Sequence, residues 1–350
     1  MRKITIFAKN KFMKLERNYN LRKYNTFGID AHCKTFFEYD NDEELFDFVR
    51  LNKDDGNFTF LVVGGGSNIL FTKDFDATII HPATKGRKIV YETSENIFVE
   101  AQAGEVWDDF VEWCIGNKAY GLENLSYIPG TVGASAVQNI GAYGAEARQF
   151  IHRVKFLHLE SGDIQYMSNE ACCFGYRESI FKHLLKGKAI ILSVVYKLSK
   201  NPSINRSYAD VEKYLTDNKI ENPSPADIRA AIIDIRRKKL PEVSEIGSAG
   251  SFFKNPVVDA VTFASLKDKF PDIKYFAAGQ NYKLAAGWLI DQCGLKGFRH
   301  NGAAVHKNQA LILINADNAT GTDVLELSAI VQEKVFDRFG VKLEPEAIII

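Results

Sequence analysis

The sequence predicts an α+β protein made of three consecutive domains. Its 350 residues are more than a single hydrophobic core normally organises. Patterns typical of helices and patterns typical of strands are mixed along the whole chain, without internal repeats or low-complexity segments. Three mixed domains in succession account for these observations most simply.

The first part of the chain, from Tyr24 to about Ala83, has the pattern of a small α/β unit. We expect a strand at residues 36–39, a helix over residues 42–51 and a buried strand, rich in β-branched residues, at 58–63. This last strand leads directly into Gly64 and two further glycines.

Short strands dominate the middle of the chain, from Gly86 to about Ser199. The predicted strands cover residues 97–102, 152–159 and 189–198, and a helix over 107–117 interrupts them. A polar connection with prolines, residues 201–225, then leads to a helix over 225–239.

The last third again mixes helix and strand, and it contains the clearest helix of the chain. Apolar residues recur there at spacings of three and four, namely Val324, Leu327, Val331, Val335 and Phe339. Thr322 or Asp323 can cap the start of this helix, and Gly340 can end it.

The composition excludes several classes of partner. The 44 basic residues balance the 44 acidic ones, so charge favours neither nucleic acid nor an anionic membrane. No apolar run approaches the roughly 20 residues that cross a bilayer. The five cysteines and the histidines lack the spacing of a disulfide framework or a metal site. We therefore expect a cytoplasmic protein with reduced thiols and no metal.

The first 18 residues are basic and lack the apolar core of a signal peptide. We expect residues 1–18 to form a disordered extension, with Met13 as an alternative start of the chain.

Two glycine loops indicate a ligand. Gly64-Gly-Gly-Ser-Asn68 follows a strand but matches neither the ATP-type phosphate loop nor the dinucleotide fingerprint, and alone it is more often a simple turn. A second loop, from Tyr127 to Gly144, combines four glycines and a proline with polar side chains. Backbone N–H groups without nearby Cβ atoms can bind an anion. Together the loops suit a long, diphosphate-bearing nucleotide cofactor.

The segment Gly247-Ser-Ala-Gly-Ser-Phe-Phe-Lys-Asn-Pro256 presents one hydroxyl, Ser251, between small residues and two aromatics. The small residues allow a ligand to approach the backbone, and the aromatics can exclude water. Ser251 is therefore a candidate proton donor or nucleophile. A serine that caps a helix or turn explains the pattern equally well.

These motifs, in their order along the chain, resemble those of the UDP-N-acetylenolpyruvoylglucosamine reductase family, type I branch. The matching segments run from about residue 20 to the C-terminus. They are Asn25–Ile29, Gly64–Leu70, Gly121–Leu125, Ile128–Gly133, Gln138–Gly144, Phe174–Lys182, Ala249–Pro256, Lys283–Cys293, Gly302–His306 and Leu343–Glu346.

The resemblance implies a three-domain flavoprotein. Two FAD-binding α+β subdomains would cover residues 19–84 and 85–239, followed by an α/β substrate-binding domain over 240–342. Residues 343–350 would form a C-terminal segment that returns to the active site. The implied activity is the NADPH-dependent reduction of UDP-N-acetylglucosamine enolpyruvate to UDP-N-acetylmuramate for peptidoglycan synthesis. We expect non-covalent FAD and a monomer.

The resemblance also assigns ligand-binding residues. The cofactor residues it implies are Gly64, Gly65, Gly66, Ser67, Asn68, Pro129, Gly130, Thr131, Gly133, Ser135, Gln138, Asn139, Gly141 and Gly144. The substrate residues it implies are Tyr176, Tyr208, Lys239, Asn255 and Gln292. Tyr208 matches a loop that covers the substrate, whereas Lys239 lies in a basic row whose ordinary explanation is a solvated helix face.

Three residues are implied in catalysis. Hydride would pass from NADPH to FAD and then to the enolpyruvyl group, with Ser251 as the proton donor. Arg177 would bind the substrate carboxylate through its planar fork, although a surface ion pair is the common fate of arginine. Glu346 would assist the enol, and Glu344, two residues earlier, would be a solvent or structural carboxylate.

Two other functions fit parts of the sequence. One is an FAD-dependent oxidase of the wider fold family, which the absence of a histidine in either glycine loop disfavours. The other is a non-catalytic FAD-binding or nucleotide-sugar-binding protein. Ser251, Arg177 and Glu346 are all present, which disfavours that alternative.

Overall fold

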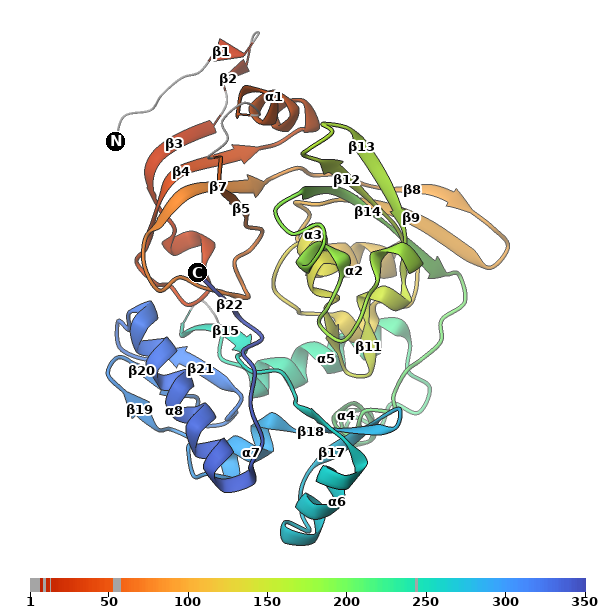
Figure 1. Ribbon diagram of the computed structural model, residues 1–350. Coiled ribbons are helices and arrows are strands. Elements are labelled where there is room, and N and C mark those ends of the chain that lie inside the picture. The colour runs from red at the N-terminus through yellow and green to blue at the C-terminus, as the bar shows by residue number, and fades with distance from the viewer. Residues whose placement is uncertain (1–6, 9–10, 13, 53–57, 243–244) are drawn as a thin grey trace. The chain divides into compact units, whose positions relative to one another are not determined.

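The computed structural model describes residues 7–8, 11–12, 14–52, 58–242 and 245–350 (Figure 1). Helices and strands are mixed throughout, which confirms the predicted α+β class. The chain forms two compact units, each made of three stretches of sequence. Unit 1 comprises residues 1–19, 33–65 and 76–238, and unit 2 comprises residues 20–32, 66–75 and 239–350. The finer division into two FAD-binding subdomains stays a prediction.

The first sheet is built mainly from unit 1, and α1 (Asp42–Asn52) contributes to its core. In spatial order its strands are β3 (Lys14–Asn20), β4 (His32–Tyr39), β7 (Phe75–Pro82) and β5 (Phe60–Val62). Phe37, Leu45, Phe48 and Ile80 are buried in the core of this sheet. The predicted strand at 58–63 is shorter than expected, and the side chains of β5 are half-buried rather than buried.

Residues 14–18 correct the prediction of a disordered extension, because they belong to β3. Leu15 is buried in the same core as Phe37, which anchors a segment that otherwise carries many charges. Nearer the N-terminus, β1 (Phe7–Ala8) pairs with β2 (Lys11–Phe12). Met13, the alternative start, lies outside the described residues.

The second sheet of unit 1 has five antiparallel strands. Their spatial order is β13 (Ile164–Ser168), β12 (Ile151–His158), β14 (Ala189–Ser199), β9 (Asn96–Gln102) and β8 (Arg87–Glu92). The helices α2 (Trp107–Gly116) and α3 (Val132–Gln138) pack on it, and Trp107, Val194 and Tyr196 are among the buried residues (Figure 1). The shorter elements here are β10 (Gly141–Ala142), β11 (Ala145–Glu146) and 3₁₀ turns at 123–125, 147–149, 170–172 and 180–182.

Two helices complete unit 1. The predicted helix α5 (Pro225–Lys239) is present, and its residues up to 238 belong to this unit. The connection predicted to be irregular contains a further helix, α4 (Ala209–Asp217). Val211 and Leu215 bury α4 against α5. With only two buried positions, this helix has too weak a periodic pattern for sequence prediction.

Unit 2 has two small antiparallel sheets with helices. One sheet has the spatial order β15 (Gly247–Ser251), β21 (Ile312–Asn315), β20 (Ala303–Val305) and β19 (Arg299–His300). The other has the order β16 (Val257–Val258), β18 (Asn281–Leu284) and β17 (Tyr275–Ala278). The helices are α6 (Ala260–Lys269), α7 (Ala286–Gln292) and α8 (Gly321–Phe339), and a 3₁₀ turn covers 22–24. Near the C-terminus, β22 (Ile348–Ile349) pairs in parallel with β6 (Ile69–Leu70).

The ends of α8 test the predicted capping residues. Gly340 ends the helix in the left-handed conformation, with φ 67°, as predicted. The cap at the start is Thr320, not Thr322 or Asp323. Its hydroxyl accepts from the Asp323 N–H while the Asp323 carboxylate accepts from the Thr320 N–H, which forms a capping box. The helix therefore starts slightly before its first apolar residue.

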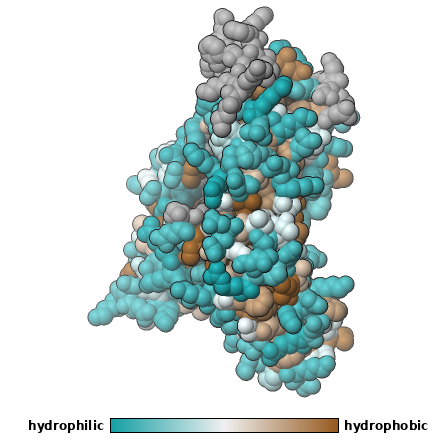
Figure 2. All heavy atoms as spheres, turned by 90° about the vertical axis from the view of Figure 1, so that its left-hand side faces the viewer, coloured by the Kyte–Doolittle hydropathy of each residue, from teal (hydrophilic) through white to brown (hydrophobic). Residues whose placement is uncertain are grey.

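The surface is predominantly polar on the face that Figure 2 shows, with hydrophobic side chains in small groups. Among the described residues, the helices are either too short or too polar to cross a membrane.

Candidate active site

The first glycine loop packs against the second one within unit 1. A Cβ atom on Gly64 would lie 2.5 Å from the Thr131 Oγ1, and one on Gly65 would lie 3.1 Å from the Gly130 Cα. Since the neighbouring atom at Gly65 is backbone, a side chain there would displace the loop. The two glycine-rich segments, far apart in sequence, therefore form one surface.

The first loop leaves backbone donors available to a ligand. Within the described part of the chain, the N–H groups of Gly64, Gly65 and Gly66 donate to no protein acceptor. Gly66 has φ 63°, and successive N–H groups in such a turn are typical of anion sites. Ser67 and Asn68 continue the turn into β6.

The second loop uses several of its polar groups to hold its own shape. The Thr131 hydroxyl caps α3, and the Gly133 N–H donates to the Ala103 carbonyl. The buried Ser135 hydroxyl donates to the Val132 carbonyl and lies 2.8 Å from the Tyr196 hydroxyl. Thr131, Gly133 and Ser135 therefore shape the loop through their protein contacts. Pro129, just before this helix, is exposed.

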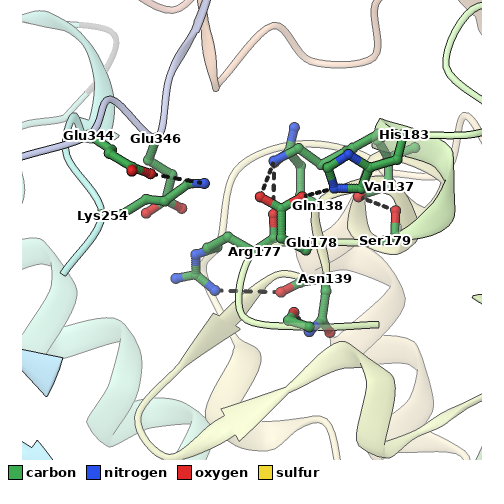
Figure 3. A network of polar contacts seen from close by, with 12 residues as sticks. Val137, Gln138, Asn139, Arg177, Glu178, Ser179, His183, Lys254, Glu344 and Glu346 are labelled. Atoms are coloured by element: carbon green, nitrogen blue, oxygen red, sulfur yellow. Dashed lines mark hydrogen bonds and ion pairs between the residues drawn. The ribbon is translucent and has the colours of Figure 1, made fainter. Parts of the chain in front are cut away.

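Arg177 lies in a tight turn that is tied to the end of α3 (Figure 3). Its Nη2 donates to the Gly141 carbonyl at 2.7 Å and its Nη1 to the Asn139 carbonyl at 3.5 Å. The Asn139 Nδ2 donates to the Gly175 carbonyl at 2.7 Å, and its Oδ1 accepts from the Arg148 N–H. The side chain of Asn139 thus joins two loops of the protein.

Lys182 is a supporting residue to which sequence reasoning gave no role. Its Nζ donates to the Arg177 carbonyl at 2.8 Å and lies 3.4 Å from the Gln138 Oε1. The Arg177 guanidinium also stacks over the Tyr176 ring, at 5.4 Å. Arg177 has φ 59°, which non-glycine residues adopt only where contacts of this kind hold them.

Ser251 is the last residue of β15, directly after a bulge. Pairing with β21 shifts between Ser248 and Ser251, and Gly250 adopts φ 66° within that shift. The Ser251 side chain is exposed and makes no hydrogen bond to any described residue. The next helix begins at Ala260, so Ser251 caps no helix. The bulge explains the glycine, which tolerates a positive φ.

Glu346 lies in the C-terminal segment, which runs beside the residues after Ser251. The Glu346 N–H donates to the Phe252 carbonyl at 2.7 Å, and the Asn68 Nδ2 donates to the Glu346 carbonyl at 3.1 Å. Unit 2 thereby brings the candidate proton donor, its candidate partner and a residue of the first glycine loop onto adjacent segments.

Glu344 has different surroundings. Its side chain is 76% exposed, and it lies 4.0 Å from the Nζ of Lys254 (Figure 3). The Lys254 N–H donates to the Glu344 carbonyl. These contacts are those of an outer, structural carboxylate.

The remaining predicted substrate residues are spread over both units. Tyr208 precedes α4 and packs against Tyr143, beside Gly144 at the end of the second loop. Lys239 ends α5. The Asn255 Oδ1 accepts from the Ala286 N–H at 2.9 Å, which holds the start of α7. Gln292 ends α7 with an exposed side chain.

Comparisons with known proteins identify the family. A profile described as an FAD binding domain matches residues 34–168, and one described as the C-terminal domain of UDP-N-acetylenolpyruvoylglucosamine reductase matches residues 241–350. The UDP-N-acetylenolpyruvoylglucosamine reductase of Flavobacterium johnsoniae is 46% identical over 340 residues, covering 97% of this chain and 100% of that protein. This chain belongs to the UDP-N-acetylenolpyruvoylglucosamine reductase family.

Further relatives in the reductase family support the same assignment. The protein of that name from Pseudomonas aeruginosa is 42% identical over 335 residues, covering 95% of this chain and 98% of that protein. The crystal structure of the reductase from Thermus caldophilus superposes with a TM-score of 0.67 at 27% identity, and the match covers 97% of this chain and 99% of that one. The resemblance drawn from the sequence motifs is confirmed.

The residues present fit the FAD that this reductase family uses. Both glycine loops lie inside the matched FAD-binding region, and within unit 1 the first supplies the unpartnered N–H groups of Gly64 and Gly65 beside the second. A diphosphate needs such donors, and a loop without side chains lets it approach. Among the described residues, no group of three or more His, Cys, Asp or Glu side chains could hold a metal ion.

Proposed function

We propose that the chain reduces UDP-N-acetylglucosamine enolpyruvate to UDP-N-acetylmuramate, with FAD as cofactor and NADPH as reductant. The product is a precursor of peptidoglycan. Membership of the reductase family supports this function. The observation that carries it is the hydrogen bond from Asn68 to Glu346, which links a cofactor loop to the segment beside Ser251.

The two glycine loops would hold FAD non-covalently. The N–H groups of residues 64–66 would bind its diphosphate, and the loop around Gly130 would give the close approach. Bound FAD supplies hydride transfer between NADPH and the terminal carbon of the enolpyruvyl group.

Ser251 would donate the proton that completes the reduction. Negative charge develops on the substrate carbon next to the one that receives hydride, and a carbanion is basic enough to take a proton from an alcohol. The Ser251 hydroxyl is exposed and has no competing hydrogen bond among the described residues. Glu346, on the adjacent segment, would stabilise the enol or pass on the proton.

Arg177 would bind the substrate carboxylate and stabilise the charge that grows there. The contacts to Gly141 and Asn139 use part of its fork and fix its direction. Tyr176, Tyr208, Lys239, Asn255 and Gln292 are proposed to bind the UDP part and the sugar. For Asn255 the Nδ2 group is the proposed contact, since the Oδ1 already accepts from Ala286.

A turnover assay tests the proposed function. Purified, FAD-loaded protein should oxidise NADPH rapidly only when UDP-N-acetylglucosamine enolpyruvate is present, with one lactyl ether formed per NADPH. Equal NADPH oxidation with and without that substrate would refute the function. Hydrogen peroxide formed from oxygen with an alcohol or sugar substrate would instead support the oxidase.

We further propose that the enzyme works as a monomer in the cytoplasm; the cysteine spacing, typical of reduced thiols, supports the compartment. Sedimentation of the FAD-loaded protein would check the oligomeric state. A dimer at micromolar concentration would contradict it.

A further inference from the structure

Arg236, in α5, contacts two tyrosines of the second glycine loop. Its Nε donates a hydrogen bond to the Tyr127 carbonyl, 2.9 Å away. Its guanidinium also lies close to the Tyr143 phenol: burial raises the pKa of Tyr143, and the nearby Arg236 cation opposes that shift. Tyr127 begins the loop of residues 127–144 and Tyr143 is its last residue but one. A single cation therefore binds one end of the loop and lies beside the other.

Both tyrosines have an unfavourable backbone conformation. φ is 58° at Tyr127 and 48° at Tyr143, a region that bulky residues rarely adopt. Such conformations persist only where surrounding contacts hold them, and they are concentrated at ligand sites. The hydrogen bond from Arg236 to the Tyr127 carbonyl and the charge of Arg236 beside Tyr143 are contacts of this kind, so the loop depends on the cation.

The charged side chain of Arg236 in turn depends on contacts with the second glycine loop. Burial lowers the pKa of Arg236, and the nearby Tyr143 and Asp108 oppose that shift. Asp108 is shared, since both of its oxygens accept from Arg229, at 2.5 and 2.9 Å. A buried charge is costly unless its hydrogen bonds are made. Arg236 therefore needs the carbonyl of Tyr127, and the nearby phenol of Tyr143 favours its charged form.

Tyr143 also contacts the segment that carries Tyr208. The two rings meet edge to face with centroids 5.1 Å apart. Close by, the buried Asn124 side chain donates to the carbonyls of Tyr143 and Asn205, at 3.0 and 3.1 Å. The end of the glycine loop and the Tyr208 segment are thus joined twice within unit 1.

We propose that Arg236 is a positioning residue that fixes the second glycine loop for FAD and, through Tyr143, fixes Tyr208 for the UDP substrate. The part that concerns Tyr208 rests on the proposed function. The part that concerns FAD rests on the matched FAD-binding region and the loop geometry alone.

Two variants and a control test the FAD part and the Tyr208 part of the proposal separately. Arg236→Met removes the guanidinium but keeps a long helix-forming side chain. Tyr143→Phe removes only the phenol oxygen and keeps the ring that packs on Tyr208. Lys238→Ala is the control, because this exposed residue of α5 is paired with Asp234 and does not contact the loop. All are measured as FAD-loaded proteins, with circular dichroism as the check on folding.

In Arg236→Met, the FAD dissociation constant, from the fluorescence of released flavin, should rise about tenfold or more, as expected for a lost charge-assisted hydrogen bond. The KM for the UDP substrate should rise as well. Tyr143→Phe should raise that KM several-fold with kcat changed by less than about twofold, and it should raise the FAD dissociation constant less than Arg236→Met does, because the bond to the Tyr127 carbonyl remains. Arg236→Lys should recover part of the FAD affinity.

The double variant decides whether the two residues act in one path. If Arg236 acts on substrate binding through Tyr143, the double variant should have the same KM as Arg236→Met, whereas independent effects would multiply. Multiplying effects, or an unchanged FAD dissociation constant in Arg236→Met, would overturn the proposal. Failure of wild-type turnover would refute the proposed function, and the FAD measurement would still decide the role of Arg236 at the loop.

Discussion

Ser251 is the residue whose substitution should separate the two halves of the reaction. Ser251→Ala removes a hydroxyl that bonds to no described residue, so stability should change little. NADPH should still reduce the flavin at close to the wild-type rate. Reoxidation by the UDP substrate should slow by about 10²- to 10⁴-fold, because only that half needs the proton. Stopped-flow absorbance of the flavin measures both rates.

Ser248→Ala is the matched control for this prediction. Ser248 lies on the same strand, is buried, and holds the Thr26 segment through backbone contacts that alanine keeps. Both rates should stay near those of the wild type. A Ser251 variant that loses both half-reactions equally would show a structural role for this residue.

Arg177→Lys should lower kcat/KM by about 10- to 100-fold, because an ammonium cannot bind a carboxylate bidentately. The lysine also cannot reach both the Gly141 and the Asn139 carbonyls as the fork does. Steady-state kinetics and flavin content measure the effect. Arg153→Lys, on the exposed side of β12, is the control. An unchanged kcat/KM in Arg177→Lys would remove this residue from the mechanism.

At the scale of elements, the start of α8 gives a direct test of capping. Thr320→Ala should lower the free energy of unfolding by about 1 kcal/mol, since it removes the side chain that accepts from the Asp323 N–H. Thr322→Ala, in the first turn but exposed, should change it by less than about 0.5 kcal/mol. Urea denaturation measures both. Equal effects of the two substitutions would contradict the observed cap.

The stability that the capping box of Thr320 and Asp323 contributes should depend on pH. The hydrogen bonds from the Thr320 N–H and hydroxyl lower the pKa of Asp323 below its ordinary value of 3.8. A carboxyl with a lowered pKa in the folded state stabilises the fold above its unfolded pKa, and this contribution is lost as pH falls through the folded value. The difference between wild type and Asp323→Asn should therefore shrink below about pH 3.8. A difference independent of pH would contradict this.

Helices and strands could be predicted where apolar residues repeat with a clear period along the sequence. They could not be predicted where one contact between residues far apart in the chain decides whether the element forms. Helices such as α1, α5 and α8 repeat apolar residues over several turns, so the sequence reveals them. The strand β3 depends on Leu15 packing into a core formed by residues far along the chain, and α4 depends on two such positions. The local sequence pattern does not show which distant residues these side chains contact.

The residues of the candidate site also fall into those that the sequence reveals and those that it does not. Ser251 and the glycine loops were recognisable because small residues and glycines gather around them in sequence. Lys182 was not recognisable as a support for Arg177, because its hydrogen bond to that residue is to the backbone carbonyl. Arg236 bonds to Tyr127, which lies 109 positions earlier in the chain. It stands in a row of basic residues, and the sequence does not single it out from them. Contacts to main-chain atoms leave no residue-type signal.

At the scale of the whole molecule, the C-terminal strand β22 should affect both FAD binding and the reoxidation of the flavin by substrate. Deleting Ile348–Ile350 removes the backbone bonds of residues 348–350 to Asn68, Leu70 and Thr72. The FAD dissociation constant should rise about tenfold or more at roughly 1 kcal/mol for each lost bond, and reoxidation by substrate should slow. Flavin fluorescence and stopped-flow absorbance measure the two effects.

Ile349→Val is the control for the deletion, because it leaves every backbone bond of β22 in place. It should keep the wild-type FAD affinity and reoxidation rate. A deleted protein with unchanged values for both would show that the strand does not support the site.

The hydrogen bonds of unit 2 join residues that are far apart in the chain. Thr26 bonds to a residue 222 positions later, and Asn68 to one 278 positions later. On the ribosome, the turn at residues 66–68 cannot acquire its partner Glu346 until that residue has emerged. Nascent chains should therefore capture flavin only after residues 343–350 have been translated. Cofactor loading would then wait for a segment made long after the glycine loops themselves.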